Sequence, residues 1–280
     1  EGDRPGSFRS PCGLTLDTRR IYIADTLNRR IQVFDRANKH GLLGQVDMPR
    51  GNQVGELQDP SGLCCTAPGC LIVVEYGLDR ILTVQLSPDS LEVIAVRVLA
   101  DKHLYGPFGV GFSKERLVVA DSCNHRCLVL GSAGNILFEF GDRGSGPGQF
   151  EYPQCIATFS DDHIAVSDKD NNRIQVFDEG GDFCHYIPGH WTCRLHSTGV
   201  PPGQLNGPMG ICCDRRDRLY VCDCGGNRVQ VFTRHGRWLW SSDIAGAAYD
   251  FKAPTAVVID ELGAIYIASD HCVQVFQGTR

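Results

Sequence analysis

The chain has 280 residues, 42% of them hydrophobic and 21% charged, and its net charge is −6. These proportions are those of an ordinary globular protein, and they exclude a collagen-like or disordered chain. The modest acidic balance disfavours a surface whose main task is to neutralise phosphates. No apolar run approaches the roughly 18 residues that a membrane span needs.

Six copies of one unit follow one another along residues 1–280, and we interpret them as a single domain. Each unit opens with Pro-x-Gly-apolar or a close variant, at Pro11, Pro60, Pro107, Pro153, Pro208 and Pro254. An apolar run ending in an acid comes next, at Asp25, Glu75, Asp121, Asp168 and Asp223. Five residues after each acid stands an arginine: Arg30, Arg80, Arg126, Arg173 and Arg228.

The rest of each unit predicts two more short strands. The sequence IQVF or VQVF stands at 31–34, 174–177, 229–232 and 273–276, and a glycine turn and a further apolar run follow, as in 134–141. Four β-branched and aromatic runs per unit, repeated six times without helical periodicity, predict an all-β, six-bladed propeller of four-stranded antiparallel blades. The sixth unit shows three runs, and we expect its fourth strand outside residues 1–280.

Cysteine is abundant, with 14 residues. Several lie inside apolar runs, such as Cys64, Cys212 and Cys213, and no pair has CxxC spacing. Buried free cysteine behaves as a small apolar residue. We therefore expect reduced thiols and a cytoplasmic protein, although the even count leaves a disulfide framework open.

The turn after the second strand resembles the NHL repeat. It reads Asp-x-x-Asn-x-Arg at 25–30, 121–126 and 168–173, and the segment Gly-x-Gly-x-Phe-x-x-Pro at 146–153 is similar to the same family. The resemblance covers essentially the whole chain and is nearest to the C-terminal propellers of tripartite-motif proteins. It implies a domain without enzymatic activity or cofactor that binds partners for a RING-type ubiquitin ligase. Some family members bind RNA, so RNA remains the alternative.

Several units depart from the NHL pattern. Glu75 and Leu78 replace the Asp and Asn of the second unit, Cys155 and Ala256 replace glycine, and the sixth unit lacks the arginine. We expect these changes to alter the geometry of single blades and to leave the fold intact.

The recurring acid and arginine are interpreted as a structural pair that fixes each turn; the alternative is that the arginines are free to meet a ligand. The same turns and the blade-joining segments are expected on one rim, the top face, whose summed charge is slightly acidic. We predict that this face binds protein partners, and the candidate contact residues are Arg29, Arg30, Tyr76, Tyr105, Phe108, His125, Lys169, Asn172, Trp191 and Arg194.

The sequence gives little evidence for a metal site or a catalytic site. The long segment 186–208 contains His190, Cys193 and His196, just after Cys184 and His185, but the spacing matches no zinc motif. No histidine recurs at an equivalent strand position, and no motif of a hydrolase or nucleotide-binding enzyme is present. We predict no catalytic residue and no metal, and a metal-dependent propeller enzyme is the remote alternative.

Overall fold

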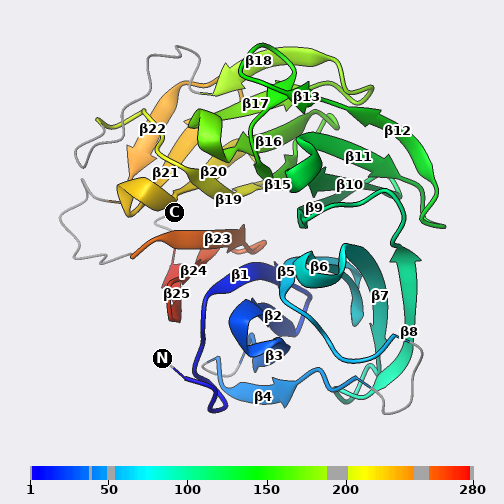
Figure 1. Ribbon diagram of the computed structural model, residues 1–280. Helices are drawn as coiled ribbons and strands as arrows, with labels where there is room; N and C mark the ends of the chain where they lie inside the picture. The colour runs from blue at the N-terminus through cyan, green and yellow to red at the C-terminus, as the bar shows by residue number, and fades with distance from the viewer. Residues whose placement is uncertain (1, 38–39, 49–53, 188–200, 243–251, 278–280) are drawn as a thin grey trace.

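The computed structural model describes residues 2–37, 40–48, 54–187, 201–242 and 252–277. They form a ring of six sheets around a central axis, as predicted, five sheets having four strands and one having three (Figure 1). The first two blades consist of β1 (Pro11–Leu16), β2 (Arg20–Asp25), β3 (Arg30–Asp35) and β4 (Leu42–Gln45), then β5 (Pro60–Ala67), β6 (Cys70–Glu75), β7 (Arg80–Leu86) and β8 (Val93–Ala100).

The remaining blades repeat this order. Blade 3 consists of β9 (Pro107–Ser113), β10 (Arg116–Asp121), β11 (Arg126–Leu130) and β12 (Ile136–Phe140). Blades 4 and 5 consist of β15 (Pro153–Thr158), β16 (Ile164–Asp168), β17 (Arg173–Phe177) and β18 (Phe183–Ile187), then β19 (Pro208–Cys213), β20 (Arg218–Asp223), β21 (Arg228–Thr233) and β22 (Trp238–Ser241). Blade 6 consists of β23 (Pro254–Ile259), β24 (Ala264–Ser269) and β25 (Cys272–Gln277).

Two minor kinds of element complete the described chain. A short parallel pair, β13 (Asp142–Arg143) and β14 (Gln149–Phe150), lies between blades 3 and 4. Single-turn 3-10 helices join the second and third strands of the first five blades: η1 (Thr26–Asn28), η2 (Tyr76–Leu78), η3 (Ser122–Asn124), η4 (Lys169–Asn171) and η5 (Cys224–Gly226). No described helix is long and apolar enough to cross a membrane.

The core lies between the blades. Successive residues of a strand point to opposite faces of the sheet, so each blade offers apolar side chains to both neighbours. Blade 1 contributes Tyr22 and Val33, for example, and blade 2 meets them with Leu71 and Val84. The other face of blade 2 presents Ile72 to blade 3. This packing fixes the angular position of every blade, and therefore of the loops at both ends of the ring.

The glycine of the opening motif allows neighbouring inner strands to approach closely. A Cβ atom on Gly13 would lie 2.2 Å from the carbonyl oxygen of Ser61, and one on Gly109 would lie 2.3 Å from that of Gln154. Cys155 and Ala256 occupy this position in blades 4 and 6, and both still belong to inner strands. The fold therefore tolerates these two departures, as expected.

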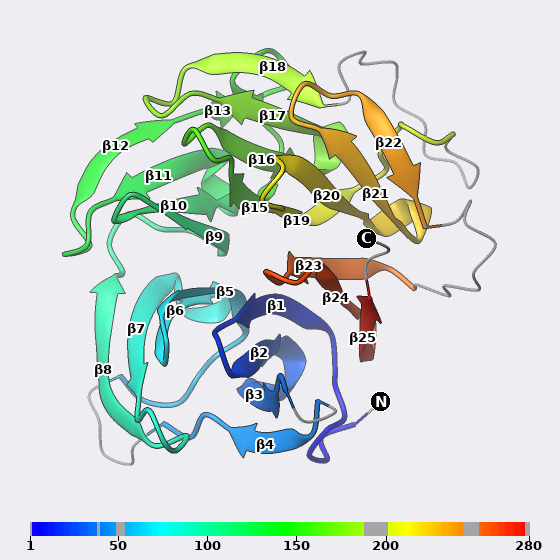
Figure 2. The ribbon, with the colours of Figure 1, turned by 180° about the vertical axis from the view of Figure 1, so that it is seen from behind.

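The ring closes by packing of blade 6 against blade 1. Strand β1 lies beside β23 in both views (Figures 1 and 2), and Thr255 Oγ1 donates a hydrogen bond of 2.5 Å to the carbonyl oxygen of Pro11. Phe8 packs among side chains of blades 1 and 6, including Ile21 and Tyr266. No fourth strand of blade 6 lies within the described residues, so strand β25 ends that sheet.

Candidate protein-binding face

The acid at the end of each second strand organises the turn that follows it. Asp168 is fully buried and accepts hydrogen bonds from the Glu151 amide at 2.7 Å, Asn171 Nδ2 at 2.9 Å and Arg173 Nε at 2.7 Å. Arg173 also donates to three carbonyl oxygens of the preceding blade-joining segment, those of Ser145, Gly146 and Gln149. The pair thus ties the turn to that segment.

The same ion pair recurs in five blades, with N–O distances from 2.5 to 3.0 Å. Glu75 fills the role in blade 2, because its Oε1 accepts from the Gln58 amide and its Oε2 accepts from Arg80 Nε. The longer side chain therefore preserves the turn. These contacts support the structural interpretation of the pair, since the guanidinium groups are engaged inside the protein.

Each turn ends on a residue with left-handed backbone geometry that reaches the next blade. His125 Nδ1 accepts from the Tyr152 amide at 3.2 Å, and Asn172 Oδ1 accepts from the Gly207 amide at 2.7 Å. His125 is only 7% exposed. Both residues were candidates for partner contact; the structure places their side chains in links between blades.

The turns and blade-joining segments share one rim, the top face, as the sequence predicted. In η3 the Cys123 amide donates to the Tyr105 carbonyl, and in η4 the Asp170 amide donates to the Glu151 carbonyl. Phe108 is the second residue of the inner strand of blade 3 and lines the central channel.

Three of the predicted contact residues form a cluster on the top face of blades 2 and 3. Tyr76 is 43% exposed and Tyr105 is 60% exposed. The ring of Tyr76 packs edge-on against Phe108, with centroids 6.2 Å apart. The Tyr76 hydroxyl lies 3.9 Å from Cys123 Sγ, and this contact raises the pKa of Tyr76, which stays protonated at physiological pH.

Leu78 joins this cluster and was missed by the sequence analysis. It is 43% exposed and stands in η2 where Asn28, Asn124 and Asn171 stand in other turns. Those asparagines donate to the repeat acid, and leucine cannot. The departure from the repeat was itself the signal, because it exchanges an inward hydrogen bond for an exposed apolar side chain. We call Tyr76, Leu78, Tyr105 and Phe108 the tyrosine patch.

The remaining predicted residues make other contacts. The side chain of Arg29 is 61% exposed and lies 3.9 Å from the Asp59 carboxylate. Lys169 is 41% exposed and lies 4.0 Å from Asp170. Arg30 is mostly covered and bonded to Asp25. Trp191 and Arg194 lie outside the described residues.

The central channel is lined by the inner strands of all six blades and has a volume of about 240 Å³. Its wall includes the thiols of Cys64, Cys155 and Cys212. Burial raises the pKa of Cys64 to about 12 and also raises that of Cys155 and Cys212. Because the thiolate is the nucleophile and the metal ligand, these cysteines are suited to packing and not to chemistry at neutral pH.

The described residues contain no group of three His, Cys, Asp or Glu side chains arranged to hold a metal ion. Within the candidate zinc segment, His185 Nε2 lies 2.8 Å from the Arg234 carbonyl oxygen and Cys184 Sγ lies 3.6 Å from the Asp182 carbonyl oxygen. Its other members lie outside the described residues. All described cysteines are free thiols.

Comparison with known proteins identifies the repeat. The NHL repeat family matches residues 150–177 and 205–232. Protein brain tumor of Drosophila melanogaster is 28% identical over 48% of this chain and 12% of that protein. RING finger protein nhl-1 of Caenorhabditis elegans is 32% identical over 46% of this chain and 12% of that protein. Human E3 ubiquitin-protein ligase NHLRC1 is 27% identical over 37% of this chain and 26% of that protein.

Solved structures share the fold at low identity. A streptogramin B lyase superposes with a TM-score of 0.66 and 17% identity, over 99% of this chain and 85% of that one. A putative gluconolactonase superposes with a TM-score of 0.67 and 16% identity, over 98% of this chain and 91% of that one. At such identity the likeness describes the fold alone. From the matched repeats, the ring of blades and these relatives, the chain is a six-bladed β-propeller with NHL repeats at 150–177 and 205–232, and it resembles the propellers of tripartite-motif NHL proteins.

Proposed function

We propose that this propeller is a protein-binding platform whose top face, centred on the tyrosine patch, recruits partners or substrates for a larger ubiquitin ligase. The observation that carries the proposal is the exposure of Tyr76, Leu78 and Tyr105 together on a rigid ring. Tyrosine is a favoured anchor of protein interfaces, because it contributes much contact area with little loss of side-chain freedom.

The ligase assignment draws support from the relatives. Two of them are named as a RING finger protein and an E3 ubiquitin-protein ligase, and the chain spans only 12% and 26% of their lengths. A propeller that forms a small part of such a protein is well placed to select what the remainder modifies. The free thiols of the described residues agree with a cytoplasmic location.

RNA is the second candidate, because exposed tyrosines can stack on unpaired bases. The charge opposes it, since the chain carries −6 and Arg29 on this face is already close to Asp59. We therefore expect RNA affinity no tighter than non-specific binding, typically 10⁻⁴–10⁻⁶ M at physiological salt.

The test compares two variants of immobilised propeller in nuclease-treated lysate, with captured proteins quantified by mass spectrometry. Tyr76→Ser combined with Tyr105→Ser should lose the specific partners without lowering the thermal midpoint. Arg216→Ala, an exposed change on the opposite face, should retain them. Retention by the tyrosine variant would overturn the choice of face. Nanomolar, sequence-selective binding of a short RNA would replace the protein-binding function with the RNA function.

A further inference from the structure

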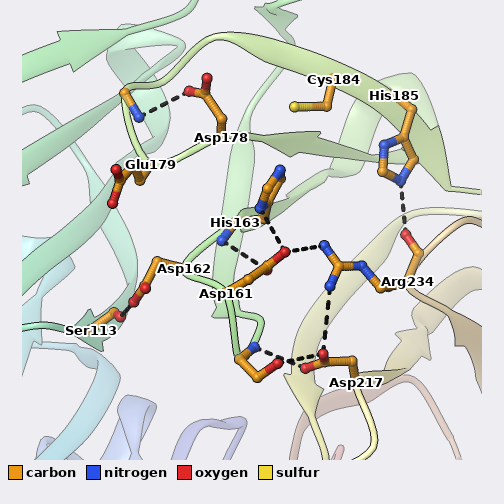
Figure 3. Close-up of polar contacts among 12 residues, drawn as sticks. Ser113, Asp161, Asp162, His163, Asp178, Glu179, Cys184, His185, Asp217 and Arg234 are labelled. Carbon is orange, nitrogen blue, oxygen red and sulfur yellow. Dashed lines mark hydrogen bonds and ion pairs between the residues drawn. The ribbon is translucent and has the colours of Figure 1, made fainter.

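Polar links join the bottom ends of neighbouring blades, opposite the top face. In each link the turn between the first and second strands of one blade meets the turn between the third and fourth strands of the next. Asp161 of blade 4 pairs with Arg234 of blade 5 at 2.5 Å (Figure 3). Lys114 of blade 3 pairs with Glu179 of blade 4, and Asp260 of blade 6 pairs with Arg36 of blade 1.

Blade 2 and blade 3 lack such a link in the described residues. The corresponding turns carry Ala67, Pro68 and Gly69 on blade 2, and 131–134 (GSAG) on blade 3. None of these residues has a charged or long side chain. Gly134 of the blade 3 turn lies close to the main chain of Leu99 in β8, and a groove of about 560 Å³ lies between the two blades.

The groove wall also departs from the repeat. Cys70 stands where blades 1, 3 and 5 begin their second strand with Arg20, Arg116 and Arg218. Ile72 stands where three other blades have tyrosine, at Tyr22, Tyr220 and Tyr266. The smaller side chains on the blade 2 wall leave space in the groove. The blade 3 wall contributes Phe112, which is 36% exposed. The volume lies within the 300–1,000 Å³ typical of ligand sites.

The groove opens beside an unusual outer strand. β8 has eight residues, while the outer strands β4, β12, β18 and β22 have four or five. Ile94 is 59% exposed and Val98 is 38% exposed. No strand of the described chain pairs with the outer edge of β8. A long, apolar, unpaired edge is a template for another strand.

The charge on β8 itself indicates the kind of strand. Arg97 is the only charged residue of β8, lines the groove, and forms no ion pair among the described residues, while Glu115 of blade 3 also lines the groove. Its Nε donates to Thr83 Oγ1 at 3.1 Å, which holds the side chain on the groove wall. Two copies of β8 paired about Arg97 would place like charges together, which is unfavourable. An acidic residue in the incoming strand would complement Arg97.

We propose that the outer edge of β8 and the adjoining groove bind an extended peptide segment of a partner protein, apolar and carrying an acidic residue. The segment adds to blade 2 as a fifth strand through main-chain hydrogen bonds. Side chains on one face of the segment lie at the outer end of the groove, and its acid pairs with Arg97. This interface lies apart from the tyrosine patch and does not depend on it.

The test uses a fluorescein-labelled ten-residue peptide in which valine alternates with glutamate and threonine. Fluorescence anisotropy should show saturable binding, weakened about fivefold or more when lysine replaces glutamate in the peptide. Arg97→Glu, a substitution of an exposed residue, should reverse that preference. Tyr105→Ala on the top face should leave binding unchanged. Hydrogen exchange should slow over 93–100 on binding.

Three results would overturn the proposal. The first is no saturable binding of the glutamate peptide to the parent protein. The second is equal affinity of the parent and Arg97→Glu for both peptides. The third is sedimentation showing that the protein dimerises and that Arg97→Glu strengthens the dimer, because β8 would then serve a second copy of the chain.

Discussion

Asp168→Ala is the most informative perturbation of the repeat. Arg173 is 1% exposed, so the change leaves a guanidinium buried without its carboxylate. The amide of Glu151 and the side-chain amides of Asn171 and Gln175 lose an acceptor at the same time. Removing one member of a buried ion pair costs about 3–5 kcal/mol.

The matched variant is Asp121→Ala in blade 3. Its partner Arg126 is 21% exposed and has a second carboxylate, Glu139, at 2.7 Å. The guanidinium group of Arg126 therefore stays partly solvated and keeps its ion pair with Glu139. We expect a smaller loss, about 1–3 kcal/mol. An unfolding entropy of about 2.1 cal/mol/K per residue converts these losses into falls of the thermal midpoint of roughly 5–9 °C for Asp168→Ala and 2–5 °C for Asp121→Ala.

Differential scanning calorimetry of the two variants and the parent measures this order directly. Asp168→Glu is the conservative control, because Glu75 performs the same task in blade 2, and it should recover most of the loss. Equal midpoints for Asp168→Ala and the parent would refute the structural role of the pair. A larger fall for Asp121→Ala than for Asp168→Ala would refute the link between burial and cost.

Three further predictions address other parts of the ring. Leu78→Asn restores the repeat residue and should keep or raise the thermal midpoint while weakening partner capture; a lower midpoint would show that Leu78 packs. Arg36 lowers the pKa of Glu261, so the stability from this pair is present above the unfolded value of about 4.3 and is lost as pH falls through the lower folded value. In Arg36→Ala the urea concentration at the unfolding midpoint should therefore fall less steeply with pH across this acid range than in the parent. An equally steep fall in both proteins would contradict this. Iodoacetamide should label exposed Cys184 in the native protein and Cys155 only after denaturation, as peptide mass spectrometry can check.

The repeat in the sequence was enough to predict the six blades and the shared top rim. A propeller blade is a local unit, because its four strands pair in chain order and its turns use residues near in sequence. The acid and arginine of each turn are five residues apart, so the pair was visible as a spacing. Tyr76 and Tyr105 were likewise predicted as candidate contact residues, from their places in a turn and in a blade-joining segment, and both are exposed.

Contacts between blades were decided only by the tertiary structure. His125 and Asn172 stand in exposed-looking turns of the sequence, yet each meets a backbone amide about thirty residues further along. The groove beside β8 has the same origin, because Ile72 and Phe112 belong to different blades and neither marks a cavity by itself. The repeat in the sequence determines the strands and turns of each blade. The packing of one blade against the next depends on the volumes and charges of side chains that are far apart in the sequence.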